Sequence, residues 1–189
     1  EFGGGTGICS ILFNFLYEFK KILIIEKISD FIDIIKKNIS ENKLENIFPV
    51  NLDITEIDKH FGKETADIII FNPPYRNINK FRPSIDPVRT TMHYYSPKQL
   101  SCFIEKINYL LNPEGHAYII FLYASKSELE SEFIKNKLNV IKYVNIYLND
   151  KPKWVIFVIS KIKTRKVLFS NLFLSNDILS SPEKIFSFK

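Results

Sequence analysis

The amino-acid sequence predicts a single α/β domain in which helices cover a mostly parallel sheet. Short apolar, β-branched runs alternate along the chain with segments whose apolar residues recur at helical spacing. A glycine-rich turn stands at the start, and two strand-like runs near the end are separated by a turn sequence. These features predict a sheet that begins with parallel strands and closes with an antiparallel hairpin.

The order of elements follows from the local patterns. The expected strands are 22–25, 47–52, 67–71, 117–122, 140–148 and 154–162. The expected helices are 8–19, 28–41, 97–111 and 125–138. Turns are expected at 112–115 and 149–152, and a long loop at 77–96. The remainder, 163–189, reads as a polar tail of the domain.

Composition places the chain among globular proteins. With 189 residues, 46% apolar and 25% charged, it is expected to form one domain, 1–189, and a monomer in the cytoplasm. No apolar run is long enough to cross a membrane. The net charge of +5 permits a polyanionic partner, although a genome-wide bias towards lysine explains it equally well. Cys9 and Cys102 are expected to be free thiols, and no His, Cys or acid spacing predicts a metal site.

The glycine turn at the start indicates a ligand site. Glu1, Gly3, Gly5 and Gly7 form an acid-x-Gly-x-Gly-x-Gly pattern before a helix. Such a turn lets the backbone approach a ligand closely, and Glu1 can meet a cationic part of that ligand. The spacing differs from the Gly-x-Gly-x-x-Gly of dinucleotide sites and favours S-adenosylmethionine (SAM). A purely structural glycine turn is the alternative.

Two acids follow the next two strands. Glu26 comes about 20 residues after the glycine turn, a spacing at which an acid can bind both hydroxyls of a ribose. Asp53 follows the third strand and can accept a hydrogen bond from an adenine amino group. Each also has an ordinary reading, Glu26 as a surface acid that opens the next helix and Asp53 as an unremarkable loop residue.

The fourth strand ends in the most informative motif of the chain. The apolar run of 67–71 is followed by Asn72, Pro73, Pro74 and Tyr75. The two prolines stop ladder pairing and hold the backbone extended, which fixes Asn72 at the carboxyl end of the strand. Ligands bind at that edge of an open α/β sheet. An amide, two prolines and an aromatic ring suit a flat, amine-bearing group, with a structural turn as the alternative.

The loop after this motif is rich in cations and long enough to act as a lid or a substrate contact. Its cations Arg76, Lys80, Arg82 and Arg89 stand against the single acid Asp86 and suit contacts to phosphate. His93 is the only histidine of the chain with a functional reading. Solvated surface charge explains any one of the cations equally well.

Taken together, the glycine turn, the acids and Asn72-Pro73-Pro74-Tyr75 resemble the class I SAM-dependent methyltransferases. The chain looks closest to the tRNA adenine-N6 methyltransferases that modify valine tRNA beside the anticodon. The resemblance runs from Glu1 to about Ile162 and includes the Arg89 to Tyr94 stretch. It implies a Rossmann-like, seven-stranded, mostly parallel sheet that ends in an antiparallel hairpin, with a truncated first strand. The loop after the motif lacks the glycine that relatives often carry.

The resemblance also implies roles for single residues. Gly3, Gly5 and Gly7 would hold the methionine part of SAM, Glu26 its ribose and Asp53 its adenine. Asn72 and Pro73 would each accept one hydrogen of the target amine, Pro74 would complete the motif, and Asn72 would also border the cofactor. Tyr75 would stack on the target base. Arg76, Arg82, Arg89 and His93 would contact the nucleic acid.

Several functions remain open at this point. The first is methyl transfer to the N6 amine of adenine, with tRNA as the expected partner. A protein glutamine methyltransferase and a DNA adenine methyltransferase are alternatives on the same fold. A cofactor- or RNA-binding module without catalysis is an alternative of another class, and a nicotinamide dehydrogenase is more distant.

Overall fold

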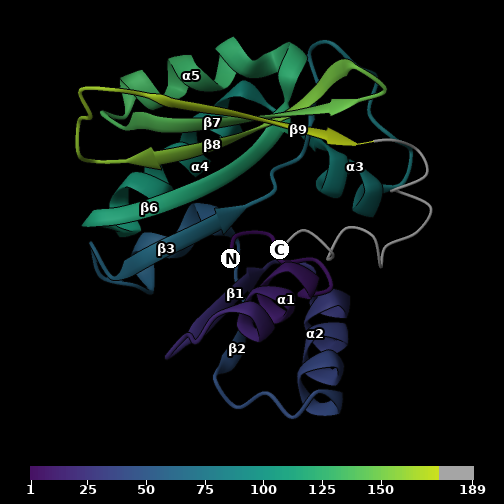
Figure 1. The fold of residues 1–189 in the computed structure, drawn as a ribbon. Coiled ribbons are helices and arrows are strands. Elements are labelled where there is room, and N and C mark those ends of the chain that lie inside the picture. Colours follow the sequence, from purple (N-terminus) through teal and green to yellow (C-terminus); the bar gives the residue numbers. More distant parts are fainter. Residues whose placement is uncertain (175–189) are drawn as a thin grey trace.

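The sheet is built in two parts in the computed structural model, which describes residues 1–174 (Figure 1). The smaller part is the parallel pair β1 (Ile22–Glu26) and β2 (Ile47–Asn51). The larger part has five strands in the order β3-β6-β8-β7-β9. Their bounds are β3 (Ala66–Phe71), β6 (Leu111–Leu122), β7 (Asn139–Leu148), β8 (Lys151–Ser160) and β9 (Leu168–Leu174).

A single residue joins the two parts. Phe2 forms parallel bridges to Ile25 in β1 and to Phe71 in β3. Its N–H donates to the carbonyl oxygen of Ile70 at 2.9 Å, and its side chain is 3% exposed. Phe2 thus occupies the place of the strand that the sequence predicts ahead of the glycine turn.

The pairing corrects the predicted seven-stranded, mostly parallel sheet. β3 runs parallel to β6, but β8 is antiparallel to both β6 and β7, so the larger part is a mixed sheet. The closing hairpin is confirmed. Its turn is shorter than predicted, because Lys151 and Pro152 already pair with β7. Only Asn149 and Asp150 form the turn, with φ of 49° and 61°, the conformation that joins two strands most tightly.

The predicted polar tail contains a strand. β9 pairs with β7 in parallel, in a register that starts at Lys142 and Leu168. Aromatic stacking explains this pairing, since Tyr143 and Phe169 lie 5.0 Å apart between ring centroids and the Tyr147–Phe173 pair 4.8 Å apart. The rest of the expected tail, 175–189, lies outside the described residues.

The four predicted helices are present with shorter bounds. They are α1 (Ile8–Leu16), α2 (Ser29–Glu41), α4 (Pro97–Leu110) and α5 (Lys126–Lys135). α1 ends before the predicted Phe19 because Tyr17 is already extended, with φ of −141°. α4 begins where predicted, since Ser96 accepts a hydrogen bond from the Gln99 N–H and the Gln99 side chain accepts one from the Ser96 N–H.

The predicted loop of 77–96 is partly ordered into regular structure. β4 (Arg76–Asn77) pairs in parallel with β5 (Tyr94–Tyr95), and α3 (Pro87–His93) precedes β5. The local signal for α3 is Asp86, whose carboxylate accepts hydrogen bonds from the N–H groups of Val88 and Arg89, followed by a proline at the first helical position. We call residues 78–93, which leave and return at the β4–β5 pair, the lid segment.

Two packed clusters support these elements. The main one lies between the five-stranded sheet and α4 and α5, and includes the fully buried Ile104, Phe121 and Phe157. The smaller one holds β1 and β2 against α1 and α2 through Ile24 and Ile35. Two 3-10 helices, η1 (Ile54–Lys59) and η2 (Tyr123–Ser125), complete the order of elements. Within residues 1–174, no helix combines the length and apolar composition that crossing a membrane requires.

The predicted turn at 112–115 is an irregularity inside β6. Its register with β3 changes from Ala66–Leu111 to Ile68–His116, so four residues of β6 stand opposite one residue of β3. Gly115 is buried there, and a Cβ atom on it would lie 2.9 Å from the carbonyl oxygen of Asp67. A side chain at this position would therefore press on the backbone of β3.

We expect Gly115→Ala to lower the free energy of unfolding by about 1–3 kcal/mol, because neighbouring backbone must move to admit the methyl group. Urea denaturation followed by circular dichroism measures this change. Gly62→Ala is the matched control, because its Cβ would be 3.6 Å from the nearest atom, a Thr65 methyl group. Equal stability of the Gly115 variant and the wild type would contradict this view of β6.

Candidate functional site

A cavity of about 460 Å³ lies at the carboxyl ends of β1 and β3, the edge of the sheet that the sequence predicts. It brings together most of the predicted site residues. Those in its wall are Glu1, Gly3, Gly5, Glu26, Asp53, Asn72, Pro73, Pro74, Tyr75 and His93. Residues that are distant in the sequence thus meet in one place.

The glycine turn forms one wall of the cavity through its backbone. Gly3 and Gly5 have φ of 60° and 54°, values that favour glycine. A Cβ atom on either residue would have no other atom within 4 Å, so both turn their open side to free space. Asn38 of α2 steadies the turn by donating from Nδ2 to the carbonyl oxygen of Thr6 at 2.9 Å.

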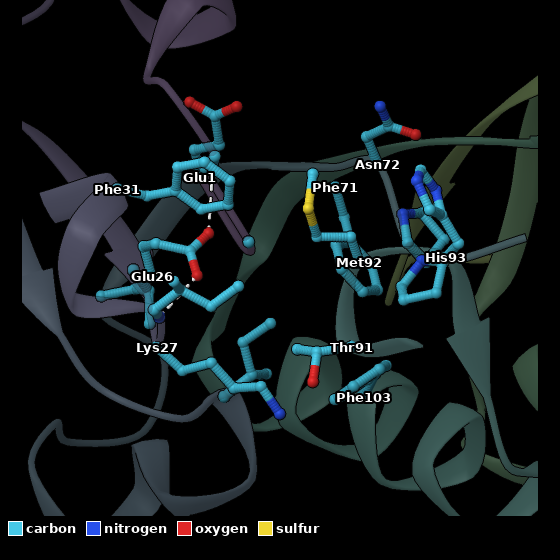
Figure 2. Close-up of a pocket in the computed structure, with 18 of the residues that line it drawn as sticks. Glu1, Glu26, Lys27, Phe31, Phe71, Asn72, Thr91, Met92, His93 and Phe103 are labelled. Carbon is cyan, nitrogen blue, oxygen red and sulfur yellow. Dashed lines mark hydrogen bonds between the residues drawn. The ribbon is translucent and has the colours of Figure 1, made fainter. Parts of the chain in front are cut away.

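Glu26 ties this turn to the end of β1. Its Oε2 accepts a hydrogen bond from the Gly5 N–H at 2.9 Å, and its Oε1 accepts one from the Ile28 N–H at 2.9 Å (Figure 2). The residue is buried, with 6% of its surface exposed. Each oxygen of a carboxylate can accept more than one hydrogen bond. Glu26 can therefore shape the wall and still bind hydroxyl groups of a ligand.

Asp53 binds the first turn of η1 through one oxygen and pairs with Lys27 through the other. Its Oδ1 accepts from the N–H and the hydroxyl of Thr55 in the first turn of η1, and its Oδ2 lies 3.5 Å from Nζ of Lys27. Burial acts to raise the pKa of Asp53, but the Thr55 hydrogen bonds and the Lys27 charge outweigh it, and the pKa falls below its usual value. Asp53 is thus a carboxylate at neutral pH.

Glu1 is held against the first turns of α1. Its Oε2 accepts hydrogen bonds from the N–H of Ser10 at 3.1 Å and from the Ser10 hydroxyl at 2.5 Å. Cys9 lies beside it in the wall of the cavity. Burial, followed by the charge of Glu1, raises the pKa of the Cys9 thiol to about 11. The cavity therefore has three carboxylates on its glycine-turn side, from Glu1, Glu26 and Asp53, next to a neutral thiol.

The Asn72 motif forms the opposite wall. Asn72 is exposed at the end of β3, whereas Pro73 is buried. The Tyr75 hydroxyl donates a hydrogen bond to Oδ1 of Asn72, and the Tyr75 ring meets Phe121 edge-on with centroids 6.0 Å apart. Burial raises the pKa of Tyr75 to about 12, so its hydroxyl remains a donor at neutral pH. The hydrogen bond and the ring contact thus hold the motif in place, with the Asn72 amide in the cavity wall.

The end of the lid segment covers this half of the cavity. Figure 2 shows Met92 and His93 beside Asn72, across the cavity from Glu26 and Phe31. Thr91, Met92 and His93 come from the last turn of α3. His93 is thus part of the cavity wall. Its predicted contact with a substrate stays a prediction.

Other predicted residues lie outside the cavity wall. Gly7 caps α1, and a Cβ on it would lie 3.2 Å from the Ile24 side chain, so its open side faces the small core cluster. Arg76 donates to the Tyr94 hydroxyl at 3.1 Å, and Arg89 lies 3.8 Å from Asp86. Arg82 is exposed on the lid segment. The predicted phosphate contacts of these arginines stay predictions.

Sequence reasoning missed several lining residues. Phe31 and Phe103 were expected only as apolar positions of helices, yet both reach the cavity, as do Thr91 and Met92 of α3. The Asp86-Pro87 pair was the available signal for α3. Among residues 1–174, no group of three or more His, Cys, Asp and Glu side chains could hold a metal ion.

Comparison of the sequence with protein-family models gives no match, and neither does comparison with curated proteins. Solved structures do match. A ribosomal protein L11 methylase from Lactobacillus delbrueckii subsp. bulgaricus has a TM-score of 0.62 and 16% identity, with 86% of this chain and 68% of that chain covered. An rRNA methylase from Streptococcus thermophilus has a TM-score of 0.60 and 14% identity, with 86% and 85% covered.

A SAM-dependent methyltransferase from Aquifex aeolicus also matches, with a TM-score of 0.59, 14% identity, and 84% of this chain and 79% of that chain covered. At such identities the likeness shows the fold alone. The chain thus has the α/β fold of these methyltransferases, with a central mixed sheet.

The raised pKa of Cys9 predicts slow alkylation. With a pKa of about 11, about one molecule in a thousand carries the thiolate at pH 8, and the thiolate is the reactive form. We expect iodoacetamide to label Cys9 at least ~100-fold more slowly than free cysteine at this pH. Mass spectrometry of timed samples measures the rate, and Cys9→Ser separates it from labelling of Cys102. A rate equal to that of free cysteine would contradict the burial of this thiol.

Proposed function

We propose that this chain is a SAM-dependent methyltransferase that methylates the N6 amine of adenine in RNA, with tRNA as the expected substrate. The observation that carries the proposal is the position of Asn72, Pro73, Pro74 and Tyr75. They form the wall of a cavity whose opposite wall is a glycine turn with a buried acid. A cofactor half and an acceptor half therefore face each other.

The residues on the first half fit SAM. When bound, SAM supplies an electrophilic methyl group on a positively charged sulfur. The carboxylates of Glu1, Glu26 and Asp53 favour a cationic ligand. The open backbone of Gly3 and Gly5 admits the methionine part. Both Glu26 oxygens can accept from ribose hydroxyls, and Oδ2 of Asp53 can accept from an adenine amino group.

Apolar residues complete this half of the cavity. Ile28, Phe31 and Ile54 line it and suit the flat faces of an adenine ring. Three predicted cofactor residues of the wall, Glu1, Glu26 and Asp53, then contact different parts of one ligand, and Asn72 borders it. This division of roles is what distinguishes the proposal from a purely structural glycine turn.

The second half suits a conjugated amine. An exocyclic amine is a poor nucleophile because its lone pair is delocalised into the ring. Oδ1 of Asn72 would accept a hydrogen bond from one amine hydrogen, and the Pro73 carbonyl would accept one from the other. These two bonds would draw the nitrogen towards tetrahedral geometry. The same two dipoles would stabilise positive charge that develops on the nitrogen. The proton lost after methylation passes to water, so no strong base is needed.

Tyr75 has two parts in this scheme. Its hydroxyl donates to Oδ1 of Asn72, so it keeps the amide oriented until a substrate amine takes over that oxygen. Its ring offers a face for a base that has been turned out of its stack. Phe121 meets the ring edge-on and supports it. The tyrosine can therefore position both the amide and the base.

Charge and exposure favour a nucleic acid over a protein substrate. Arg76, Lys80, Arg82 and Arg89 are exposed in and beside the lid segment, which carries the residues next to Asn72. Cations at the rim of a site can contact phosphates while the cavity binds the base. Proteins with the same fold include both an rRNA methylase and a ribosomal protein L11 methylase, so the fold itself does not choose between the two classes. A glutamine side chain in a protein remains the alternative that the same two acceptors would fit.

The deciding experiment is methyl transfer from labelled SAM to tRNA, rRNA, DNA and a translation-factor protein in parallel. Mass spectrometry of nucleosides should then find N6-methyladenosine in the tRNA. Methylation of protein glutamine alone would show that the substrate is a protein and not RNA, while the proposed role of Asn72 and Pro73 in methyl transfer would stand. Calorimetry without heat of SAM binding, on a folded sample, would argue for a module without catalysis.

We expect Asn72→Ala to lower kcat by at least ~100-fold, because it removes one of the two acceptors of the amine. The dissociation constant of SAM should change less than about threefold, since the glycine-turn side of the cavity is intact. Radiolabelled transfer and calorimetry measure the two quantities. Asn42→Ala is the matched control, because Asn42 lies at the end of α2. Near-normal turnover of the Asn72 variant would overturn the assignment.

Two substitutions of Tyr75 separate its ring from its hydroxyl. Tyr75→Phe keeps the stacking face and should reduce kcat/KM by less than about tenfold, whereas Tyr75→Ala should reduce it by about a further tenfold or more. Steady-state kinetics with tRNA measure both variants. Equal losses would show that stacking contributes nothing.

A further inference from the structure

The lid segment is held at both of its ends by one short pairing. It leaves after β4 and returns at β5, where Arg76 pairs with Tyr94 and Asn77 with Tyr95. The Ile78 N–H also donates to the Tyr95 carbonyl oxygen at 3.0 Å. Two paired residues on each strand give little stability by themselves. The position of Met92 and His93 over the Asn72 motif must depend on other contacts of this pair.

Those contacts converge on one carboxylate of α5. Oε1 of Glu128 accepts hydrogen bonds from Nδ2 of Asn77 at 2.9 Å and from the Tyr95 hydroxyl at 3.0 Å. Its Oε2 forms an ion pair with Nζ of Lys80 at 3.2 Å. Asn77 directly precedes the lid segment, Lys80 lies within it, and Tyr95 follows it in β5. Glu128 is thus bonded to the segment at both ends.

Burial makes these bonds costly to lose. Asn77 is 6% exposed, Tyr95 is 1% exposed, and 25% of the Glu128 side chain is exposed. Burial, followed by the charge of Glu128, raises the pKa of the Tyr95 hydroxyl, which therefore remains a donor. Without Glu128, an amide and a hydroxyl would lose their partner in a largely dry place. Glu128 also stands in the first turn of α5, where the helix dipole favours an acid.

The same pair reaches the acceptor half of the cavity through one ring. Tyr95 and Tyr75 both contact the fully buried Phe121, each with ring centroids 6.0 Å apart. Tyr75 in turn donates to Asn72. A shift of Tyr95 would therefore displace Phe121, the ring against which Tyr75 is packed.

We infer that Glu128 is a positioning residue for the acceptor substrate: it anchors both ends of the lid segment and so places Met92, His93 and Tyr75 around the Asn72 amide. This inference rests on the proposed function for its kinetic consequences. The part of the inference that concerns the position of the lid segment is independent of that function. Glu128 lies outside the cavity wall.

Four variants of the full chain test this role. Glu128→Ala removes all three bonds, whereas Glu128→Gln keeps Oε1 and loses the charge that pairs with Lys80. Lys80→Ala removes the ion pair alone and should match the glutamine variant in protease sensitivity. Glu130→Ala is the matched control, because Glu130 is on the same helix and accepts a tyrosine hydroxyl, that of Tyr143, at 2.6 Å, but has no bond to the lid segment.

The first measurement is limited trypsin digestion, which requires no activity. We expect Glu128→Ala to be cut after Arg89 about tenfold faster than wild type, since freeing the ends of a segment favours its local opening. Glu128→Gln and Lys80→Ala should be cut less than about threefold faster, because an exposed ion pair contributes little. Glu130→Ala should match wild type. Equal cleavage of all variants would overturn the inference, whatever reaction the protein catalyses.

The second measurement separates positioning from a general loss of structure. We expect Glu128→Ala to raise the KM for the acceptor about tenfold, with the SAM dissociation constant unchanged within about twofold. Glu128→Gln should restore most of the acceptor KM. A parallel loss of SAM affinity would show that Glu128 supports the whole domain and would overturn the positioning role. If no acceptor is methylated by wild type, the digestion still decides the anchor and only the proposed function fails.

Discussion

The arrangement of the site depends on the pairing of Phe2 with two strands at once. Its bridges to Ile25 and Phe71 are the links that bring β1 beside β3. The glycine turn follows Phe2 directly, and the Asn72 motif follows Phe71. Because parallel strands end at the same edge of a sheet, this pairing makes the two motifs opposite walls of one cavity. Its burial at 3% exposure shows that the join is part of the core.

Two carboxylates then fix the walls that this pairing brings together. Glu26 receives the N–H groups of Gly5 and Ile28 and so holds the glycine turn to the end of β1. Glu128 accepts hydrogen bonds from the side chains of Asn77 and Tyr95 and so holds the lid segment to α5. Both are acids that accept hydrogen bonds from segments distant in the sequence. Such bonds are worth more than those between neutral groups, and they fix direction as well as distance.

The sequence predicted those parts of the fold that local patterns specify. Apolar runs and helical spacing located the strands and helices, and Asn149 and Asp150 fell in the predicted turn. β9 and α3 were missed for different reasons. β9 depends on stacking of Phe169 and Phe173 on β7, a contact between distant segments, whereas α3 had a local signal in Asp86. The bonds of Glu128 also join distant segments, and no spacing in the sequence indicates them.

The hydrogen-bond acceptors of the Asn72 wall favour one class of methyl-accepting group over another. The Asn72 amide oxygen and the Pro73 carbonyl are two neighbouring hydrogen-bond acceptors. Together they suit an atom that carries two hydrogens, and a conjugated amine supplies both. A hydroxyl supplies one, so an alcohol would leave an acceptor without a partner in a partly dry site, at a cost of about 1–3 kcal/mol. The Tyr75 hydroxyl already satisfies the Asn72 oxygen before a substrate arrives. Under the proposed function, a substrate would therefore have to offer more than the single hydrogen bond that it displaces, and of these two substrate classes only the amine does so.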